Sequence, residues 1–377
     1  MKSIQEFIPE RKILLNPGPA TTSDAVKLAM IVSDICPREE EFCTLMNSIK
    51  QDLVKVVGGE SHYKAVMFTS SGTGGVEAAI TSLVPEGKKI LIIENGAYGK
   101  RMYDIASTYK IPALLHKVSY TNIPDISEIR KILRADREIG IIGIVDHETT
   151  TGIRNPIQAI ADMAHEEGVE LIVDCMSSYA GLEIDLIKWN VAAIVSSSNK
   201  CIQGMPGLSF VIVRNDILDA SKSVKRSFYH DIYSQYSGFN SNGQMQFTPP
   251  VHVVYALRKA LDLFFKETAK KRIERYRKNF ATLKSGLTNM GFKFLVTPEL
   301  QSDILIAVLE PTNDSYSFAT LHDFLYARGY TIYPGKLNES NTFRLSVIGD
   351  LNESDIKSFL VELKNCFIEN GWSVGLR

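Results

Sequence analysis

The chain has 377 residues, of which 42 are Lys or Arg and 43 are Asp or Glu, so its formal net charge at pH 7 is -1. This near balance argues against nucleic acid or an anionic membrane as a partner, because either would select an excess of positive charge. The hydrophobic content of 45% and the charged content of 23% are those of an ordinary globular protein. The composition therefore favours small-molecule chemistry.

Signals for export, membrane insertion and disulfide formation are not found in the sequence. The first residues, MKSIQEFIPERK, contain no apolar run long enough for a signal peptide, and no later stretch approaches a membrane span. The five cysteines, at positions 36, 43, 175, 201 and 366, form neither a disulfide framework nor the CxxC pairs of a zinc site. We therefore expect a cytoplasmic protein with reduced thiols.

Short apolar segments alternate with helix-like segments over the first two thirds of the chain. The expected strands are KAVMFT (64–69), KILIIE (89–94), IGIIGIVDH (139–147), VELIVD (169–174), AAIVSS (192–197) and SFVIV (209–213). The expected helices are GGVEAAITSLV (74–84), KRMYDIASTY (100–109) and PIQAIADMAHEEG (156–168). Strands this apolar are typical of sheets covered on both faces. The alternation predicts an α/β fold with a mostly parallel sheet, in a large domain over residues 16–255.

The last third of the chain has a different pattern. After the FTPP break at 247–250, the stretch VVYALRK…GLTNM (253–290) is long and carries periodic charge, which predicts a helix crossing between domains. The segments SDILIAVLE (302–310) and TFRLSVIG (342–349), with a final amphipathic helix, predict a small α+β domain. We expect three parts: an N-terminal segment (1–15), the large domain (16–255), and the inter-domain helix with the small C-terminal domain (256–377).

A glycine-rich turn, SSGTGG at residues 70–75, stands between the first expected strand and the first expected helix. Such a turn at a helix N-terminus offers free backbone N–H groups and a positive dipole to an anion, most often a phosphate. The alternative is a tight strand-to-helix turn without a ligand. The turn is not a P-loop, because no GK[ST] follows, and Glu77 stands where a dinucleotide-binding fingerprint needs its last glycine.

Two charged residues follow later strands. Asp174 ends the strand LIVD, where a buried carboxylate is costly without a cationic partner. Lys200 follows the next strand, among serines and before Gly204 and Gly207. In an open parallel sheet, ligands bind beyond the carboxyl ends of the strands, so these residues and the turn are expected to meet. Together they fit pyridoxal 5'-phosphate, with Lys200 for the aldehyde, Asp174 for the ring nitrogen and the turn for the phosphate.

The sequence also resembles a known family across nearly its whole length. The motifs LLNPGPA, SSGTGG, NGAYGKRM, DHETTTG, VDCMSSYAG, SSSNKCIQGMPG, FTPP and YPGK…FRLSVIG occur in the order found in class V aminotransferases. The resemblance implies a pyridoxal-phosphate-dependent transferase of fold type I, with a seven-stranded-type sheet. The stretches SNKCIQGMPG, HETTTG and DICPREEEF are similar to those of members that transfer the amino group of 2-aminoethylphosphonate to pyruvate.

The resemblance assigns roles to residues that the pattern alone leaves undecided. It implies that Tyr98 stacks on the cofactor ring and that Thr149 hydrogen-bonds near the ring's phenolic oxygen and Asp174. For the phosphate it implies Ser71, Gly72 and Thr73, assisted by Ser198 and by Thr248 of a neighbouring subunit. A homodimer is therefore expected. No metal is expected, since the HExxH pattern fails at position 151 after His147 and Glu148.

Arg344, in TFRLSV, is the expected anchor for the substrate's anion. One guanidinium can pair in turn with the carboxylate of pyruvate and with a phosphonate. A doubly charged phosphonate favours a second cation, and the candidates are Arg38, Arg101 and Lys336, which the sequence does not rank. The segment after Arg344 departs from the FRIGxIG that the family often shows, since residues 345–347 are Leu, Ser and Val.

Three alternatives stay open at this point. An alanine–glyoxylate or serine–pyruvate transaminase of the same family would share Lys200, Asp174 and Arg344. A non-catalytic relative of the fold is the second, although the lysine, the acid and the turn are all intact. A cysteine desulfurase is the third, and it is disfavoured because Cys201 directly follows the lysine. The sequence also leaves open whether the protein degrades phosphonates or helps to make them.

Overall fold

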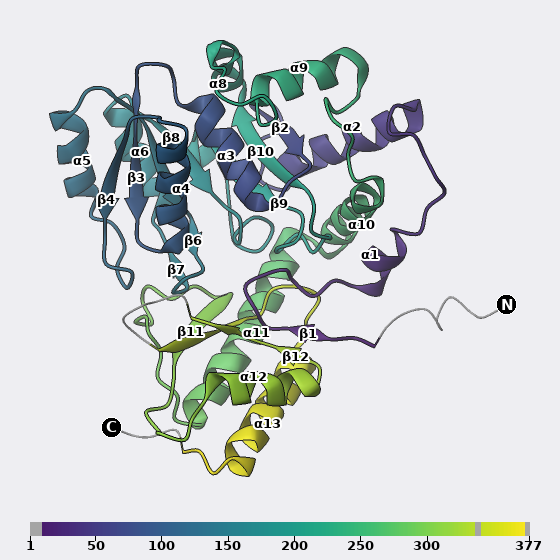
Figure 1. The fold of residues 1–377 in the computed structure, drawn as a ribbon, viewed down its shortest axis with the longest axis vertical. Coiled ribbons are helices and arrows are strands. Elements are labelled where there is room, and N and C mark those ends of the chain that lie inside the picture. The colour runs from purple at the N-terminus through teal and green to yellow at the C-terminus, as the bar shows by residue number, and fades with distance from the viewer. Residues whose placement is uncertain (1–9, 336–340, 374–377) are drawn as a thin grey trace.

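The computed structural model describes residues 10–335 and 341–373, and a seven-stranded sheet is its centre (Figure 1). The strands lie in the spatial order β2-β10-β9-β8-β5-β3-β4. Their bounds are β2 (Tyr63–Phe68), β3 (Lys89–Glu94), β4 (Ala113–Lys117), β5 (Ile139–Val145), β8 (Glu170–Asp174), β9 (Ala193–Ser197) and β10 (Ser209–Arg214). Only β10 runs antiparallel to its neighbours in this sheet. The prediction of a mostly parallel seven-stranded sheet is confirmed.

The central strands are apolar throughout because helices cover both faces of the sheet. In β3, Ile90 and Ile92 belong to one buried cluster, whereas Leu91 and Ile93 belong to another. This alternation is the pleat of the strand seen from its two faces. The helices around the sheet are α2 (Glu40–Lys55), α3 (Gly72–Leu83), α4 (Ala97–Thr108), α5 (Ile126–Ala135), α6 (Ile157–Glu166), α7 (Leu186–Trp189), α8 (Asn215–Ala220) and α9 (Ile232–Asn242).

The predicted long helix over 253–290 is two helices in the structure, α10 (Val251–Glu267) and α11 (Ala269–Asn289). They meet at Thr268, whose φ of 74° ends the first helix. The Thr268 side chain then accepts a hydrogen bond from the Lys271 backbone N–H and caps the second helix. Within the described residues, no helix has both the length and the hydropathy needed to cross a membrane.

The C-terminal part contains a three-stranded antiparallel sheet in the order β11-β14-β13. Its elements are β11 (Leu305–Leu309), α12 (Phe318–Ala327), β12 (Tyr330–Thr331), β13 (Tyr333–Pro334), β14 (Thr342–Ser346) and α13 (Glu353–Glu369). Near the N-terminus, β1 (Ile13–Leu14) pairs in parallel with β12, and α1 (Asp24–Leu28) follows. The predicted boundary between residues 255 and 256 stays a prediction, and α10 spans it.

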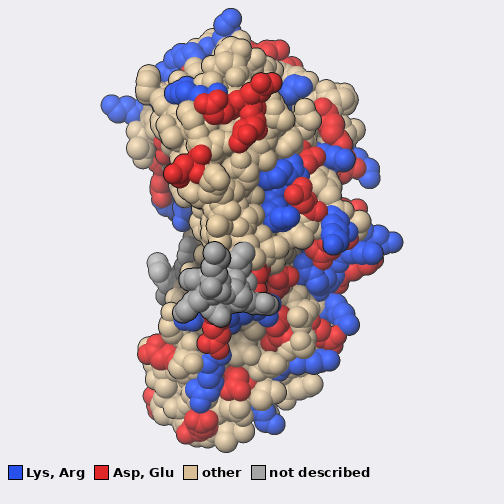
Figure 2. Space-filling model, turned by 90° about the vertical axis from the view of Figure 1, so that its right-hand side faces the viewer, with Lys and Arg blue, Asp and Glu red and all other residues tan. Residues whose placement is uncertain are grey.

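Charged side chains of both signs occur over the upper and the lower parts of the face shown in Figure 2. This distribution agrees with the balanced composition. The short strands β6 (His147–Glu148) and β7 (Ile153–Arg154) form a small antiparallel pair beyond the end of β5. They lie close to β11 of the C-terminal part in Figure 1. The functional cavity lies at the same edge of the large sheet, where the parallel strands end.

Candidate active site

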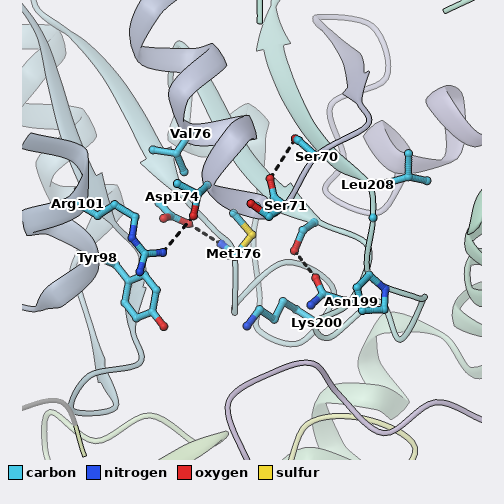
Figure 3. Close-up of a pocket in the computed structure, with 15 residues that line it drawn as sticks. Ser70, Ser71, Val76, Tyr98, Arg101, Asp174, Met176, Asn199, Lys200 and Leu208 are labelled. Atoms are coloured by element: carbon cyan, nitrogen blue, oxygen red, sulfur yellow. Dashed lines mark hydrogen bonds between the residues drawn. The ribbon is translucent and has the colours of Figure 1, made fainter. Parts of the chain in front are cut away.

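A cavity of about 340 Å³ lies at the carboxyl ends of the parallel strands (Figure 3). Its lining residues are Ser70, Ser71, Gly72, Thr73, Val76, Tyr98, Arg101, Asp174, Met176, Ser197, Asn199, Lys200, Pro206, Gly207 and Leu208. They follow β2, β3, β8 and β9 along the chain. Six residues predicted from the sequence line the cavity together: Ser71, Gly72, Thr73, Tyr98, Asp174 and Lys200. The strand-end rule for open sheets explains this convergence.

The glycine-rich turn forms one wall of the cavity. Helix α3 begins at Gly72, and Ser71 is its extended N-cap residue. A Cβ atom at position 72 would lie 2.4 Å from the Met176 sulfur, so glycine lets the Met176 side chain lie against the turn without being displaced. The first N–H groups of a helix have no partner within the helix, and the dipole makes this end positive. The turn therefore offers an anion site to the cavity.

Asp174 is a buried carboxylate, with 4% of its surface exposed. Its burial raises the pKa of the carboxyl to about 6, and the nearby Glu148 acts in the same direction. A hydrogen bond of 2.8 Å from the Met176 backbone N–H opposes this rise. The positive charges of Arg101 and Lys200 also oppose it. An acid in this state is suited to pair with a cationic group placed in the cavity.

Lys200 lies against the N-terminal segment of the chain. Its Nζ atom donates a hydrogen bond of 3.0 Å to the Pro17 carbonyl. Gly18, with a φ of 132°, makes room for this side chain, because a Cβ atom there would lie 2.1 Å from Nζ. Sequence reasoning did not assign this contact, although the NPGPA motif was the signal for it. The segment around Pro17 thus positions the amine.

Tyr98 is positioned by Glu148, a residue to which sequence reasoning gave no role. One carboxylate oxygen of Glu148 accepts from the Tyr98 backbone N–H at 3.2 Å, near the start of α4. The other accepts from the N–H and the hydroxyl of Thr150, at 3.0 and 2.6 Å. Gly96 permits this contact, since a Cβ atom there would lie 2.1 Å from Glu148 Cδ. Glu148 therefore accepts a backbone N–H at the start of α4, where the N-cap residue Gly96 has no side chain to do so.

His147 is likewise engaged within the protein. Its Nδ1 and Nε2 atoms lie 2.8 and 2.7 Å from the hydroxyls of Ser177 and Ser302. Burial lowers the pKa of His147 to about 3, so the ring is neutral. The pair of hydrogen bonds joins the segment after β8 to the segment before β11. His147 thus links the large sheet to the C-terminal part of the chain.

Arg344 comes from β14, and only 2% of its surface is exposed. Its Nε and Nη1 atoms donate to the carbonyls of Pro334 and Thr149, at 3.1 and 3.0 Å. Burial lowers the pKa of Arg344, and a hydrogen bond with the Tyr98 side chain opposes this shift. Among the described residues, no carboxylate forms an ion pair with it. A buried guanidinium oriented by carbonyls is suited to bind an anion.

Four predicted residues do not line the cavity: Thr149, Ser198, Thr248 and Arg344. Thr149 contacts Arg344 through its carbonyl. The Ser198 hydroxyl donates instead to the carbonyls of Met205 and Leu208, at 2.5 and 3.2 Å, so it supports the glycine-containing loop. Thr248 is exposed in the single chain. Ser197 and Asn199, on either side of Ser198, take the lining positions.

The three candidates for a second cation are separated by the structure. Arg101 lines the cavity. Arg38 is exposed, and its guanidinium donates to the Gln244 side chain at 2.7 Å. Lys336 lies outside the described residues.

Comparison with known proteins identifies the family. Residues 27–321 match the family described as aminotransferase class-V. This chain belongs to the class V aminotransferases. The chain is 37% identical to a 2-aminoethylphosphonate–pyruvate transaminase of Lysinibacillus sphaericus, over 94% of this chain and 97% of the relative. It is 38% identical to a protein of the same name from Klebsiella pneumoniae, over 94% of this chain and 97% of that relative.

Solved structures place the fold in the same group. Ureidoglycine–glyoxylate aminotransferase of Bacillus subtilis superposes with a TM-score of 0.89 over 98% of this chain and 96% of that chain. Because its sequence is only 20% identical to this chain, the comparison shows a similarity of fold and nothing more. The class V aminotransferase fold predicted from the motifs is therefore confirmed.

Proposed function

We propose that this class V aminotransferase uses pyridoxal 5'-phosphate to transfer the amino group of 2-aminoethylphosphonate to pyruvate, giving phosphonoacetaldehyde and L-alanine. One observation carries the cofactor assignment: a single cavity brings together a lysine, a buried acid and the open N-terminus of a helix. The names of the relatives at 37–38% identity support the substrate pair.

The residues present fit this cofactor. The aldehyde would be placed opposite Lys200, whose amine donates a hydrogen bond to the Pro17 carbonyl. Asp174 would hold the ring nitrogen, and Ser71, Gly72 and Thr73 would hold the phosphate. When bound, the cofactor supplies an electron sink for the substrate carbon that loses its proton. The side chain of Met176 lies against the turn on the cavity wall and bounds the space for the ring.

The side chains have separate tasks in this scheme. With the cofactor bound, Lys200 Nζ would take a proton from the substrate carbon that bears the amino group. It would return a proton to the carbon that was the aldehyde carbon, since the released amine would lie near both carbons. Asp174 holds a proton on the ring nitrogen, for which its carboxylate must be ionised. Tyr98 would cover one face of the ring and exclude water from it. Thr149 is assigned to the phenolic oxygen of the ring.

Arg344 is assigned to the anion of both substrates. Pyruvate and 2-aminoethylphosphonate occupy the site in turn, so one guanidinium can serve a carboxylate in one half-reaction and a phosphonate in the other. Its carbonyl partners at Pro334 and Thr149 fix the plane of the fork, next to its hydrogen bond with the Tyr98 side chain. The buried guanidinium has no ion-pair partner among the described residues, so its burial favours the binding of an anion.

We assign the active form to a homodimer in which Thr248 reaches the phosphate of the neighbouring site. Its exposure in the single chain supports this assignment. Exposed Phe228 packs against Phe247, at 5.8 Å between ring centres, beside the same segment. An aromatic side chain that is 83% exposed is typical of a surface that a partner covers.

The absorbance spectrum of the purified protein tests the function. Addition of 2-aminoethylphosphonate without a keto acid is expected to convert the cofactor band to that of the amino form, and pyruvate is expected to restore it. A band that responds only to alanine or serine would contradict the phosphonate assignment and favour the other class V transaminases. A protein that carries no such band and acquires none with added cofactor would favour a non-catalytic relative.

Cysteine desulfuration is disfavoured by the state of the thiol nearest to the lysine. Cys201 is fully buried, and its sulfur donates to the Ser177 carbonyl at 3.1 Å. Burial raises the pKa of Cys201 to about 12. Such a thiol is not a nucleophile at neutral pH.

A further inference from the structure

Arg101 is the charged lining residue to which the scheme above gives no task. It lies on α4, three residues after Tyr98, and Figure 3 shows its side chain beside Tyr98 in the cavity. Its Nη1 atom donates a hydrogen bond of 3.2 Å to the Thr73 hydroxyl. Its guanidinium carbon lies 4.8 Å from the centre of the Tyr98 ring. Its charge also acts to lower the pKa of Asp174. These neighbours all belong to the set proposed to hold the cofactor.

The proposed phosphate cradle lacks a positive charge of its own. It consists of backbone N–H groups at the start of α3 and of the hydroxyls of Ser71 and Thr73, which are neutral donors. A phosphate monoester carries about 1.5 to 2 negative charges at neutral pH. Among the lining residues that the structure describes, only Arg101 and Lys200 are cationic. Lys200 is assigned to the aldehyde, so Arg101 is the cation left for the phosphate.

The two arginines of the site share Tyr98 as a neighbour but differ in their other hydrogen-bond partners. Arg344 donates to carbonyls of Thr149 and Pro334 and lies outside the cavity lining. Arg101 contacts the glycine-rich turn instead. Among the described residues Arg101 forms no ion pair, although its charge does act on the buried carboxylate of Asp174 across the cavity.

We propose that Arg101 pairs with the phosphate of the cofactor and is not the second contact of the substrate's phosphonate. This inference rests on the proposed function, because it takes pyridoxal 5'-phosphate as the ligand of the cavity. A planar guanidinium can bind two phosphate oxygens at once while it stacks on an aromatic ring. Arg101 would thereby close the turn over the phosphate and keep Tyr98 in place.

The test compares two ligands that differ only in the phosphate, pyridoxal 5'-phosphate and pyridoxal. Equilibrium dialysis against cofactor-free protein gives the dissociation constant of each for the wild type, Arg101→Gln and Arg101→Lys. Loss of a charge-assisted pair predicts that Arg101→Gln weakens pyridoxal 5'-phosphate by about 10- to 100-fold. Pyridoxal is expected to bind Arg101→Gln as it binds the wild type. Arg101→Lys is expected to lie between, because it keeps the charge and loses the fork.

Three outcomes would overturn the proposals. Equal weakening of both ligands would mean that Arg101 acts through the ring or Asp174. Unchanged cofactor binding with a raised KM for 2-aminoethylphosphonate would make Arg101 a substrate contact. A wild type that binds neither ligand would overturn the proposed function itself, which distinguishes that failure from the other two.

A matched control separates charge loss from a local effect. Arg137, whose side chain is 64% exposed, precedes β5 at the opposite end of that strand from the cavity. Arg137→Gln makes the same change of charge and is expected to leave both dissociation constants unchanged. Circular dichroism and thermal unfolding check that Arg101→Gln is folded. If Arg101→Gln does not fold, the test is made with Arg101→Lys. Dissociation constants of Arg101→Lys that equal those of the wild type for both ligands would contradict pairing through the guanidinium fork.

Discussion

The two ends of the catalytic site are built in different ways. At the cofactor end, the glycine-rich turn, Asp174 and Lys200 follow strands of one sheet, so the order of the strands brings them together. At the substrate end, Arg344 comes from a second sheet and contacts Thr149 across 195 positions of sequence. The first end is a consequence of the sheet itself, whereas the second depends on how the C-terminal part packs against it.

Removal of the lysine is the largest perturbation of the cofactor end. Lys200→Ala is expected to lower turnover by roughly three orders of magnitude, because the proton carrier is lost. The cofactor should still bind through Asp174 and the turn. Steady-state kinetics and the absorbance spectrum check this result. Lys188→Ala, at a lysine with 75% side-chain exposure, is the control. Normal turnover of Lys200→Ala would contradict the whole scheme.

Replacement of the acid tests the same end through proton control. Asp174→Asn is expected to lower the rate of the first half-reaction by about 100-fold, since an amide does not hold the ring nitrogen protonated. Rapid-mixing absorbance with 2-aminoethylphosphonate measures this rate directly. A rate equal to that of the wild type would show that Asp174 is not the partner of the nitrogen.

Asp174→Asn is also expected to change how the stability of the protein depends on pH. Asp174 has a pKa of about 6 in the folded protein, raised mainly by burial, against an ordinary value near 3.8. Between these values the folded protein holds a proton that the unfolded chain has released, so stability falls as pH rises through this window. Without cofactor, the free energy of unfolding of Asp174→Asn should therefore rise relative to that of the wild type between pH 4 and 6. Above pH 6 the difference should level off at about 3 kcal/mol. Denaturant unfolding across pH 4 to 8 measures the difference, and a constant difference would contradict the assigned pKa.

The substrate end is tested by Arg344→Gln. Loss of a buried charged donor predicts that KM rises by about 10- to 100-fold for both pyruvate and 2-aminoethylphosphonate. Cofactor affinity should stay close to that of the wild type, in contrast to Arg101→Gln. Arg277→Gln, at an arginine with 57% side-chain exposure, is the control. An effect on one substrate alone would rule out a shared anion site.

The smallest expected effect concerns the N-terminal segment that lies between the two ends. Gly18→Ala would place a methyl group 2.1 Å from Lys200 Nζ and is expected to slow turnover several-fold by displacing the amine. Gly87→Ala is the control, because Gly87 also has a positive φ, of 75°, but has nothing within 4 Å of the added Cβ. Both variants carry backbone strain of about 1 to 3 kcal/mol, because alanine rarely adopts a positive φ. Equal turnover in the two variants would show that Pro17 and Gly18 do not position Lys200.

Local signals in the sequence account for most of the large sheet but not for all of it. The six predicted strands are apolar runs of the kind that two-sided burial requires, and all six occur. The edge strand β4 was not predicted, because its sequence ALLHK is short and only partly buried. The break between α10 and α11 was also not predicted. No glycine or proline marks it, and Thr268 adopts its positive φ within an otherwise helical pattern.

The sequence by itself determined the family, the sheet and the residues at the strand ends, because apolar periodicity and turn chemistry are local properties. It also identified Arg344, but only through the resemblance. Tertiary structure decided the contacts made across the chain: Lys200 with Pro17, Tyr98 with Glu148, and Arg344 with Thr149. It also turned the Ser198 hydroxyl toward its own loop and placed Arg101 beside the glycine-rich turn. These contacts join segments that no local pattern relates, so only the packing of the folded chain fixes them.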